Sequence, residues 1–251
     1  MLKNLNFQIF FQDKKNNVMR INLTVLVSFT ILISLFLVGC GGREFTKTPL
    51  DNYIVEFSNE PSFSVIIEDM DVDGTFFKTY KHLYKVIRNK KDGTPYSEIS
   101  GWKEVEKDFF WNNENNLGMT VLEKDEEGKI SKTASPPGYG YVGNSRYGEW
   151  RSNNGNSFWA FYGQYMFMSH MFGMTSRPVY RSHYNTYRSG GYYGGRGYYG
   201  PKTGSSTMYG TNSAQTKKSR PNFFQRRSTK SGWSSSRSRS GGRSRGFGFG
   251  K

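Results

Sequence analysis

The chain of 251 residues carries a net charge of +15, and only 35% of its residues are hydrophobic, so its core is smaller than its length alone would suggest. Its single cysteine, Cys40, excludes an internal disulfide and a cysteine-based metal cluster. Residues 43–139 hold 13 basic and 18 acidic residues, whereas residues 140–251 hold 18 basic residues and one acidic residue, which predicts an acidic folded region followed by a basic region suited to anionic partners.

The first predicted element is an export signal. Residues 21–38 contain no charged side chain and consist mostly of Leu, Ile, Val and Phe, and Arg20 precedes them. A positive flank before an apolar run is typical of a signal sequence, with the flank held in the cytoplasm and the run in the membrane. Residues 1–18 form a long polar lead-in, so we expect translation to begin at Met19.

The apolar run ends in a short motif, Leu37, Val38, Gly39 and Cys40. This motif resembles the lipobox of bacterial prolipoproteins, in which small residues before the cysteine fit a dedicated peptidase. The resemblance implies that residues 1–39 are a cleaved signal peptide and that the Cys40 thiol carries a diacylglycerol. Two or more acyl chains hold a protein on a membrane essentially permanently.

The expected location is therefore the cell envelope. An uncleaved apolar anchor is the alternative to a lipid, because eighteen apolar residues nearly span a bilayer. Both arrangements place the rest of the chain outside the cytoplasm, with residues 40–50 as its tether. The lipid can sit in the cell membrane or in an outer membrane. Gly41 replaces the aspartate of the family's inner-membrane retention signal, which favours the outer membrane in a host that has two.

Residues 51–138 are predicted to form a small β-rich (α+β) globular domain, because short apolar runs alternate there with turn signals. Segment 76–88 fits either one face of a helix or a long strand, and we favour the strand. The other predicted strands are 53–57, 63–67 and a hairpin pair, 119–122 and 129–132.

One motif in this domain could bind a metal. Asp69, Asp71 and Asp73 precede Gly74 with the spacing that opens a calcium loop, which surrounds a hard cation with oxygens. The pattern lacks the bidentate glutamate at its twelfth position, which is Tyr80. The alternative, which we favour, is an acidic turn between two strands.

Catalytic signals are sparse. No histidine lies near a cysteine or a recognisable nucleophile, and no phosphate-binding glycine loop follows a strand. His82 stands in an apolar stretch and is expected to be a core or surface histidine rather than a general base. We therefore predict that the protein is not an enzyme.

Residues 139–176 are rich in aromatic residues and methionine. Their most apolar part is a poor bilayer span, so we weigh equally a short helix in the membrane interface and a segment that docks on the globular domain. Thioether and imidazole groups here could bind a soft ion such as Cu(I), although methionine also fills apolar surfaces through its flexibility alone. The candidate ligands are Met166, Met168, His170, Met171 and Met174.

Residues 177–251 are predicted to be a basic, largely disordered tail rich in Gly, Tyr, Arg and Ser, because few aliphatic residues and a high charge cannot offset the entropy of ordering. Its composition is similar to that of nucleic-acid-binding tracts. Export makes anionic phospholipids, lipid phosphates, acidic glycans or the acidic domain itself better partners, and no specific nucleic acid is expected. The candidate anion-binding residues are Arg226, Arg227, Arg237, Arg239, Arg243 and Arg245.

The leading hypothesis is a non-enzymatic envelope lipoprotein whose basic tail binds anionic surfaces. Three alternatives stay open: a metal-handling lipoprotein that binds copper, silver or calcium, a cytoplasmic RNA-binding protein whose signal is not used, and an enzyme whose site the sequence does not reveal. Its only expected cofactor is the covalent lipid, and the sequence does not predict an oligomeric state.

Overall fold

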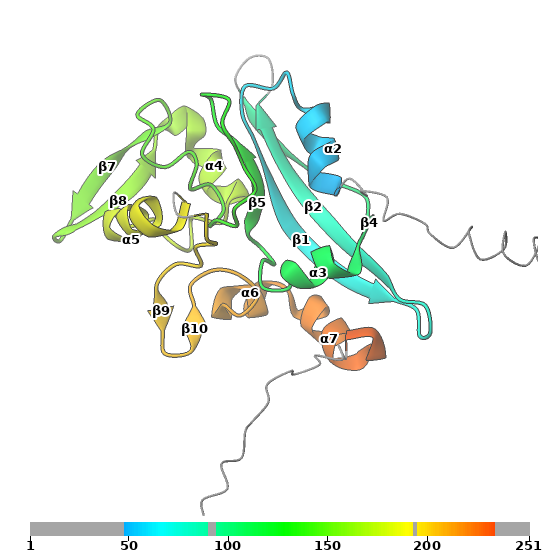
Figure 1. Cartoon of the computed structure of the whole chain (residues 1–251). Helices are drawn as coiled ribbons and strands as arrows, with labels where there is room; N and C mark the ends of the chain where they lie inside the picture. The colour runs from blue at the N-terminus through cyan, green and yellow to red at the C-terminus, as the bar shows by residue number, and fades with distance from the viewer. Residues whose placement is uncertain (1–47, 90–93, 193–194, 234–251) are drawn as a thin grey trace, which may run out of the picture. The chain divides into compact units, whose positions relative to one another are not determined.

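The computed structural model describes residues 48–89, 94–192 and 195–233 (Figure 1). Met19, the lipobox and Cys40 lie outside these ranges, as do Arg237, Arg239, Arg243 and Arg245. The described residues form antiparallel sheets together with short helices, which confirms the β-rich α+β fold.

A six-stranded antiparallel sheet forms the centre of the fold. Its strand order is β3-β2-β1-β5-β6, and β4 pairs with β2. The predicted strand at 63–67, the strand within 76–88 and the hairpin across residues 125–128 are confirmed. The bounds are β1 (Phe63–Asp73), β2 (Thr79–Asn89), β3 (Pro95–Ile99), β4 (Lys103–Val105), β5 (Thr120–Lys124) and β6 (Ile130–Ser131).

The alternation of side chains along β1 builds two separate cores. Val65 belongs to the core on one face of the sheet, and its neighbour Ile66 belongs to the core on the other. The pairing register between β1 and β2 shifts at Glu68, which has no residue opposite it on β2. This bulge reverses which side chains of β1 face each side of the sheet. Met70 and Val72 therefore belong to the first core, and the alternating Asp69, Asp71 and Asp73 project from the opposite side of the strand.

The first core lies between the sheet and four short helical segments. Its buried members from these segments include Leu50, Phe110, Phe223 and Trp233. The segments are α2 (Pro49–Glu56), α3 (Lys107–Asn112), α7 (Pro221–Thr229) and a 3-10 turn (Ser231–Trp233).

The prediction of a strand at 53–57 is wrong, because this segment belongs to α2 and its C-terminal cap. The main-chain N–H and the hydroxyl of Thr48 both donate to the Asp51 carboxylate, at 3.2 and 2.6 Å, and Pro49 occupies the first turn. Tyr53 and Phe57 stack at 5.5 Å between ring centroids and are buried in the first core. Capping and burial thus outweigh the β-propensity of this segment.

The second core joins the other face of the sheet to the aromatic segment. Ile66, Ile87 and Met119 of the sheet region meet Tyr139, Trp159 and other rings there. The sequence predicts residues 139–176 either in the membrane interface or docked on the globular domain. In the structure this segment docks on the sheet. Its elements are the hairpin β7 (Gly148–Asn153) and β8 (Asn156–Phe161), a 3-10 turn (Gly163–Tyr165) and α4 (Met166–Met171).

The prediction of a disordered tail from residue 177 is not confirmed for residues 177–192 and 195–233. Tyr187, Tyr209, Phe223 and Trp233 are all buried. Aromatic rings supply the buried area that the scarce aliphatic residues cannot. The elements are α5 (Arg181–Thr186), a π-helix (Tyr187–Tyr192), β9 (Lys202–Thr203), β10 (Ser206–Thr207), α6 (Ala214–Ser219) and α7.

Candidate functional site

The three aspartates of the calcium-loop motif lie within β1 rather than at a turn, and only Asp73 adjoins the turn that begins at Gly74. Arg226 Nη2 lies 2.6 Å from both carboxylate oxygens of Asp69. Lys230 Nζ lies 2.8 Å from Asp71 and 2.7 Å from Asp73. Hydrogen bonds from Lys230 and Lys81 lower the pKa of Asp73.

This set of contacts, which we call the ion-pair ladder, joins the basic C-terminal region to the acidic domain. Its further members are Arg220, 3.0 Å from the Glu68 carboxylate, and Lys81, 3.0 Å from Asp73. Arg227 lies 4.0 Å from the Glu114 carboxylate. Arg226 and Arg227 thus contact the acidic domain, one of the partners weighed for them. Within the described ranges, no cluster of three or more His, Cys, Asp or Glu residues is arranged to hold a metal ion.

The proposed copper ligands differ in burial. Met168 and Met174 are buried in the second core. Met166 is 58% exposed, and His170 also faces solvent. Two of the five side chains therefore serve as core residues, the role that flexible methionine side chains commonly have.

His82 is a core histidine. It is fully buried on β2, and its Nδ1 lies 3.0 Å from the Tyr84 hydroxyl. Burial lowers the pKa of His82 to about 3, so the ring is neutral at physiological pH.

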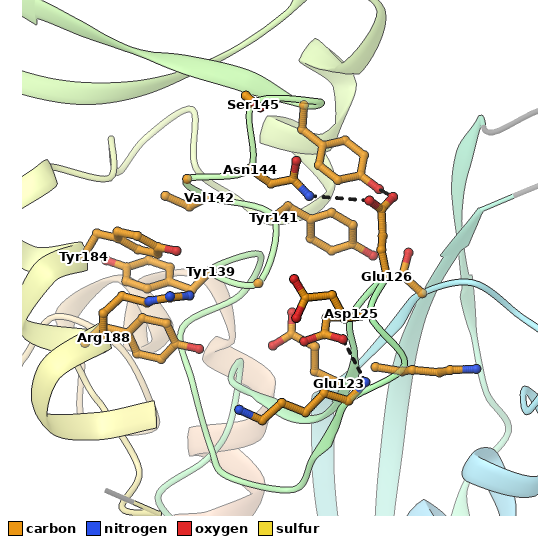
Figure 2. Close-up of a pocket in the computed structure, with 18 residues that line it drawn as sticks. Glu123, Asp125, Glu126, Tyr139, Tyr141, Val142, Asn144, Ser145, Tyr184 and Arg188 are labelled. Carbon is orange, nitrogen blue, oxygen red and sulfur yellow. Dashed lines mark hydrogen bonds between the residues drawn. The ribbon is translucent and has the colours of Figure 1, made fainter. Parts of the chain in front are cut away.

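A pocket of about 460 Å³ lies beside the end of β5 and is lined by tyrosines and acidic residues (Figure 2). We call it the tyrosine pocket. Its wall combines the end of β5 and the following turn with residues 139–147 and the α5 region. The tyrosines that line it are Tyr139, Tyr141, Tyr147, Tyr184 and Tyr187, and the acids are Glu123, Asp125, Glu126 and Glu127.

Glu123 is the most unusual of these residues, because this acidic residue is only 5% exposed. It occupies β5 opposite Ser64 of β1 and Ser131 of β6. The main-chain N–H of Gly140 donates a hydrogen bond to it. A Cβ at position 140 would lie 1.5 Å from Glu123 Oε1, so the close approach of carboxyl and main chain requires glycine.

Burial, followed by the neighbouring Asp125 carboxylate, raises the pKa of Glu123 to about 7. Across the described residues, Glu123 forms no salt bridge. Lys124, which lines the pocket, donates instead to the main-chain oxygens of Ser58 and Glu60, at 2.7 and 2.8 Å. Two further basic residues, Lys129 and Arg188, line the pocket without an ion pair to Glu123 among those of the described residues.

The neighbouring acids are held in place by other groups. Glu126 accepts hydrogen bonds from Arg146, at 2.9 Å, and from the Tyr147 hydroxyl. Asp125 accepts from the main-chain N–H of Lys129, at 2.8 Å. These bonds fix the acidic rim of the tyrosine pocket.

Tyr141 is buried beside the Glu123 carboxyl. The residue is 4% exposed, and the Ser62 and Ser64 side chains lie within hydrogen-bonding reach of its hydroxyl. Figure 2 shows the ring pointing toward the strand end that carries Glu123 and Glu126. Burial, and then the Glu123 charge, raise the pKa of Tyr141, so its hydroxyl is a neutral donor and acceptor.

Sequence reasoning did not find this site. Its one local signal is Glu123 after Val121 and Leu122, a carboxyl at the end of an apolar run. The aromatic walls come from residues far along the chain, whose proximity only the fold reveals. Comparisons of the chain with protein families, with curated proteins and with solved structures find no match. No described helix has both the length and the apolar character needed to cross a membrane.

Proposed function

We propose that this chain is a lipid-anchored protein of the cell envelope that acts by binding rather than by catalysis. The lipobox at residues 37–40 supports the anchor, and the uncharged run before it supports export. On this proposal, acyl chains on Cys40 hold the folded body outside the cytoplasm, on the cell membrane or the outer membrane.

The ligand of the tyrosine pocket, on the same proposal, is a small organic cation. The observation that carries this proposal is the buried Glu123 carboxyl, which forms no ion pair among the described residues. An ionised carboxyl is costly to bury without an opposite charge, and a bound ammonium group supplies that charge. Tyrosine faces add cation–π attraction, and a volume of about 460 Å³ suits a small molecule.

Isothermal titration calorimetry on the mature protein at pH 8 tests this proposal. The probes are choline, tetramethylammonium and the uncharged choline isostere 3,3-dimethyl-1-butanol. We expect the two cations to bind and the neutral isostere to bind at least about tenfold more weakly, a difference of about 1.4 kcal/mol. The Glu123→Gln variant should lose the preference for the cation.

The matched control is Glu127→Gln, which removes an exposed charge from the rim of the same pocket. It should change cation affinity little, because solvent screens an exposed carboxylate. Equal affinity for choline and its neutral isostere, or unchanged binding in Glu123→Gln, would contradict the proposed ligand.

The lipid anchor has its own test, intact mass combined with membrane fractionation of the native chain and a Cys40→Ala variant. We expect a mature chain that begins at an acylated Cys40 and an unprocessed variant. A soluble, unmodified native chain would contradict the envelope location.

A second binding function belongs to the basic extension beyond Trp233. Arg226 and Arg227 already contact acids of the folded body, which leaves Arg237, Arg239, Arg243 and Arg245 as the candidates for anionic lipids or glycans. Replacing these four by glutamine should remove binding to anionic vesicles, and native binding should fall steeply as salt rises. Binding that is unchanged at high salt would contradict an electrostatic attachment.

A further inference from the structure

The turn between β1 and β2 presents two adjacent aromatic rings to solvent. Phe76 is 95% exposed and Phe77 is 94% exposed, the two most exposed large hydrophobic side chains of the described residues. They lie at the tip of the longest hairpin, which Figure 1 shows extending past α3 and the neighbouring strands. Neither ring has a role in either core of the fold.

The turn is built to hold these rings outward. Gly74 has φ of +86°, and a Cβ there would lie 2.0 Å from the main-chain oxygen of Phe77, so the tight turn requires glycine. On one side, Asp73 is held by Lys81 and Lys230; on the other, Lys78 Nζ donates to the Gly232 oxygen at 3.3 Å. A turn fixed on both sides can insert its apolar tip without further ordering cost.

A groove beside the tip has a weakly basic lining. This shallow groove of about 570 Å³ runs beside the two rings toward β4 and α3. Among its lining residues, Lys78 and Lys107 are basic and Glu104 is acidic. This charge is compatible with the negative surface of bacterial phospholipids.

We propose that the Phe76–Phe77 tip inserts into the interface of the bilayer that carries the lipid anchor. Two rings are far too small for a standard protein interface, which buries about 800 Å² on each partner. A bilayer interface accepts isolated aromatic wedges without matched shape. This inference rests on the proposed anchor, since Cys40 precedes Thr48 by eight positions, and even an extended tether of that length reaches only about 29 Å.

The test uses the mature, acylated chain in vesicles of phosphatidylethanolamine and phosphatidylglycerol. With Cys40 acylated, a Thr75→Cys substitution provides one free thiol next to the rings, and a Ser205→Cys substitution provides a matched thiol on the exposed β9–β10 turn. Each is labelled with an environment-sensitive fluorophore, and doxyl-labelled lipids in the bilayer act as quenchers. We expect quenching at position 75 and none at position 205.

A second variant adds Phe76→Ser and Phe77→Ser to Thr75→Cys. Because both rings are exposed, the fold should be retained, as circular dichroism would verify, while quenching falls to the level of the position 205 probe. Quenching that persists in this variant, or a position 75 probe no more quenched than position 205, would overturn the inference. A probe at position 75 that is shielded without lipid quenching would indicate a second copy of the chain at the tip and would also overturn it.

A separate measurement shows whether Cys40 carries the lipid anchor. Intact mass of the same samples reports the acyl chains on Cys40, and an unacylated chain would take up two fluorophores instead of one. Acylated protein with an unquenched tip would contradict the insertion alone.

Discussion

Glu123 is the residue on which the functional account depends. Its burial in β5 and the nearby Asp125 raise its pKa to about 7, against 4.5 for an ordinary glutamate. The folded protein therefore holds a proton on Glu123 more tightly than the unfolded chain does. The stability that this proton provides is fully present below pH 4.5 and is lost as the pH rises through 7.

Glu123→Gln should remove this pH dependence. Relative to the variant, the native protein should lose about 3 kcal/mol of unfolding free energy between pH 4.5 and pH 8, because each pH unit between the two pKa values corresponds to about 1.4 kcal/mol. Urea unfolding of both proteins at pH 4.5 and pH 8, without ligand, measures the difference. A constant difference across this range would mean that Glu123 does not titrate near neutrality.

Gly140→Ala should disturb the same carboxyl from the opposite wall. The added Cβ would lie 1.5 Å from Glu123 Oε1, so the carboxyl must move, at a cost of about 1–3 kcal/mol, and cation binding should weaken. Gly163→Ala is the control, since a Cβ there meets no atom within 4 Å. Thermal unfolding and calorimetry of both variants provide the comparison. Equal behaviour of the two variants would contradict the close approach at position 140.

At the scale of elements, α7 lies beside β1 where β5 no longer pairs with it. β5 pairs with β1 only from Phe63 to Ile66, and beyond that point the ion-pair ladder joins β1 to α7. Covering an exposed edge in this way prevents pairing with another chain. The partial burial of Asp71, 14% exposed at its side chain, makes its ion pairs stronger than those at the surface.

Asp71→Ala should therefore destabilise the fold by about 1–2 kcal/mol, and more salt should reduce this difference. The control is Glu149→Ala, which breaks an exposed pair with Arg151 and should cost at most about 0.5 kcal/mol. Urea unfolding at low and high sodium chloride measures both. Equal and small effects of the two substitutions would show that the ladder adds nothing to stability.

Elements with a strong local pattern could be predicted from the sequence, and elements decided by distant contacts could not. The β5–β6 hairpin follows from two short apolar runs around a charged turn with Gly128 at positive φ. The helix at α2 depends on a cap at Thr48 and on burial of Tyr53, which outweigh a strand-like composition. The pairing of Asp69 with Arg226 spans 157 positions and leaves no local signal beyond opposite charge.

At the scale of the whole molecule, the C-terminal region contributes to the core. Composition alone predicts disorder from residue 177, since it weighs aliphatic content and charge. The buried rings of Phe223 and Trp233, which pack together at 5.3 Å between centroids, show why that reasoning fails here. The tyrosine pocket is equally hidden from the sequence, because Glu123 and Tyr187 reach it from opposite halves of the chain.

Two truncated chains distinguish the contribution of residues 221–233 to the first core from the proposed vesicle binding by residues 234–251. Deleting residues 221–251 removes two buried rings of the first core and should abolish cooperative unfolding, because losing one such ring costs about 3–5 kcal/mol. Deleting residues 234–251 retains every described contact, so it should leave the thermal midpoint unchanged while it removes salt-dependent binding to anionic vesicles. Equal stability of the two truncated chains would contradict a structural role for α7.

Proton release on cation binding reports whether the ligand pairs with Glu123. If the ligand pairs with Glu123, binding at pH 7 should release about half a proton per choline, and binding at pH 9 should release almost none. Calorimetry in buffers of different ionisation enthalpy measures this number, with Glu123→Gln as the control that should release none. We expect a pH-dependent release that disappears in the variant. Binding without proton exchange at pH 7, or the same release in Glu123→Gln, would contradict this pairing.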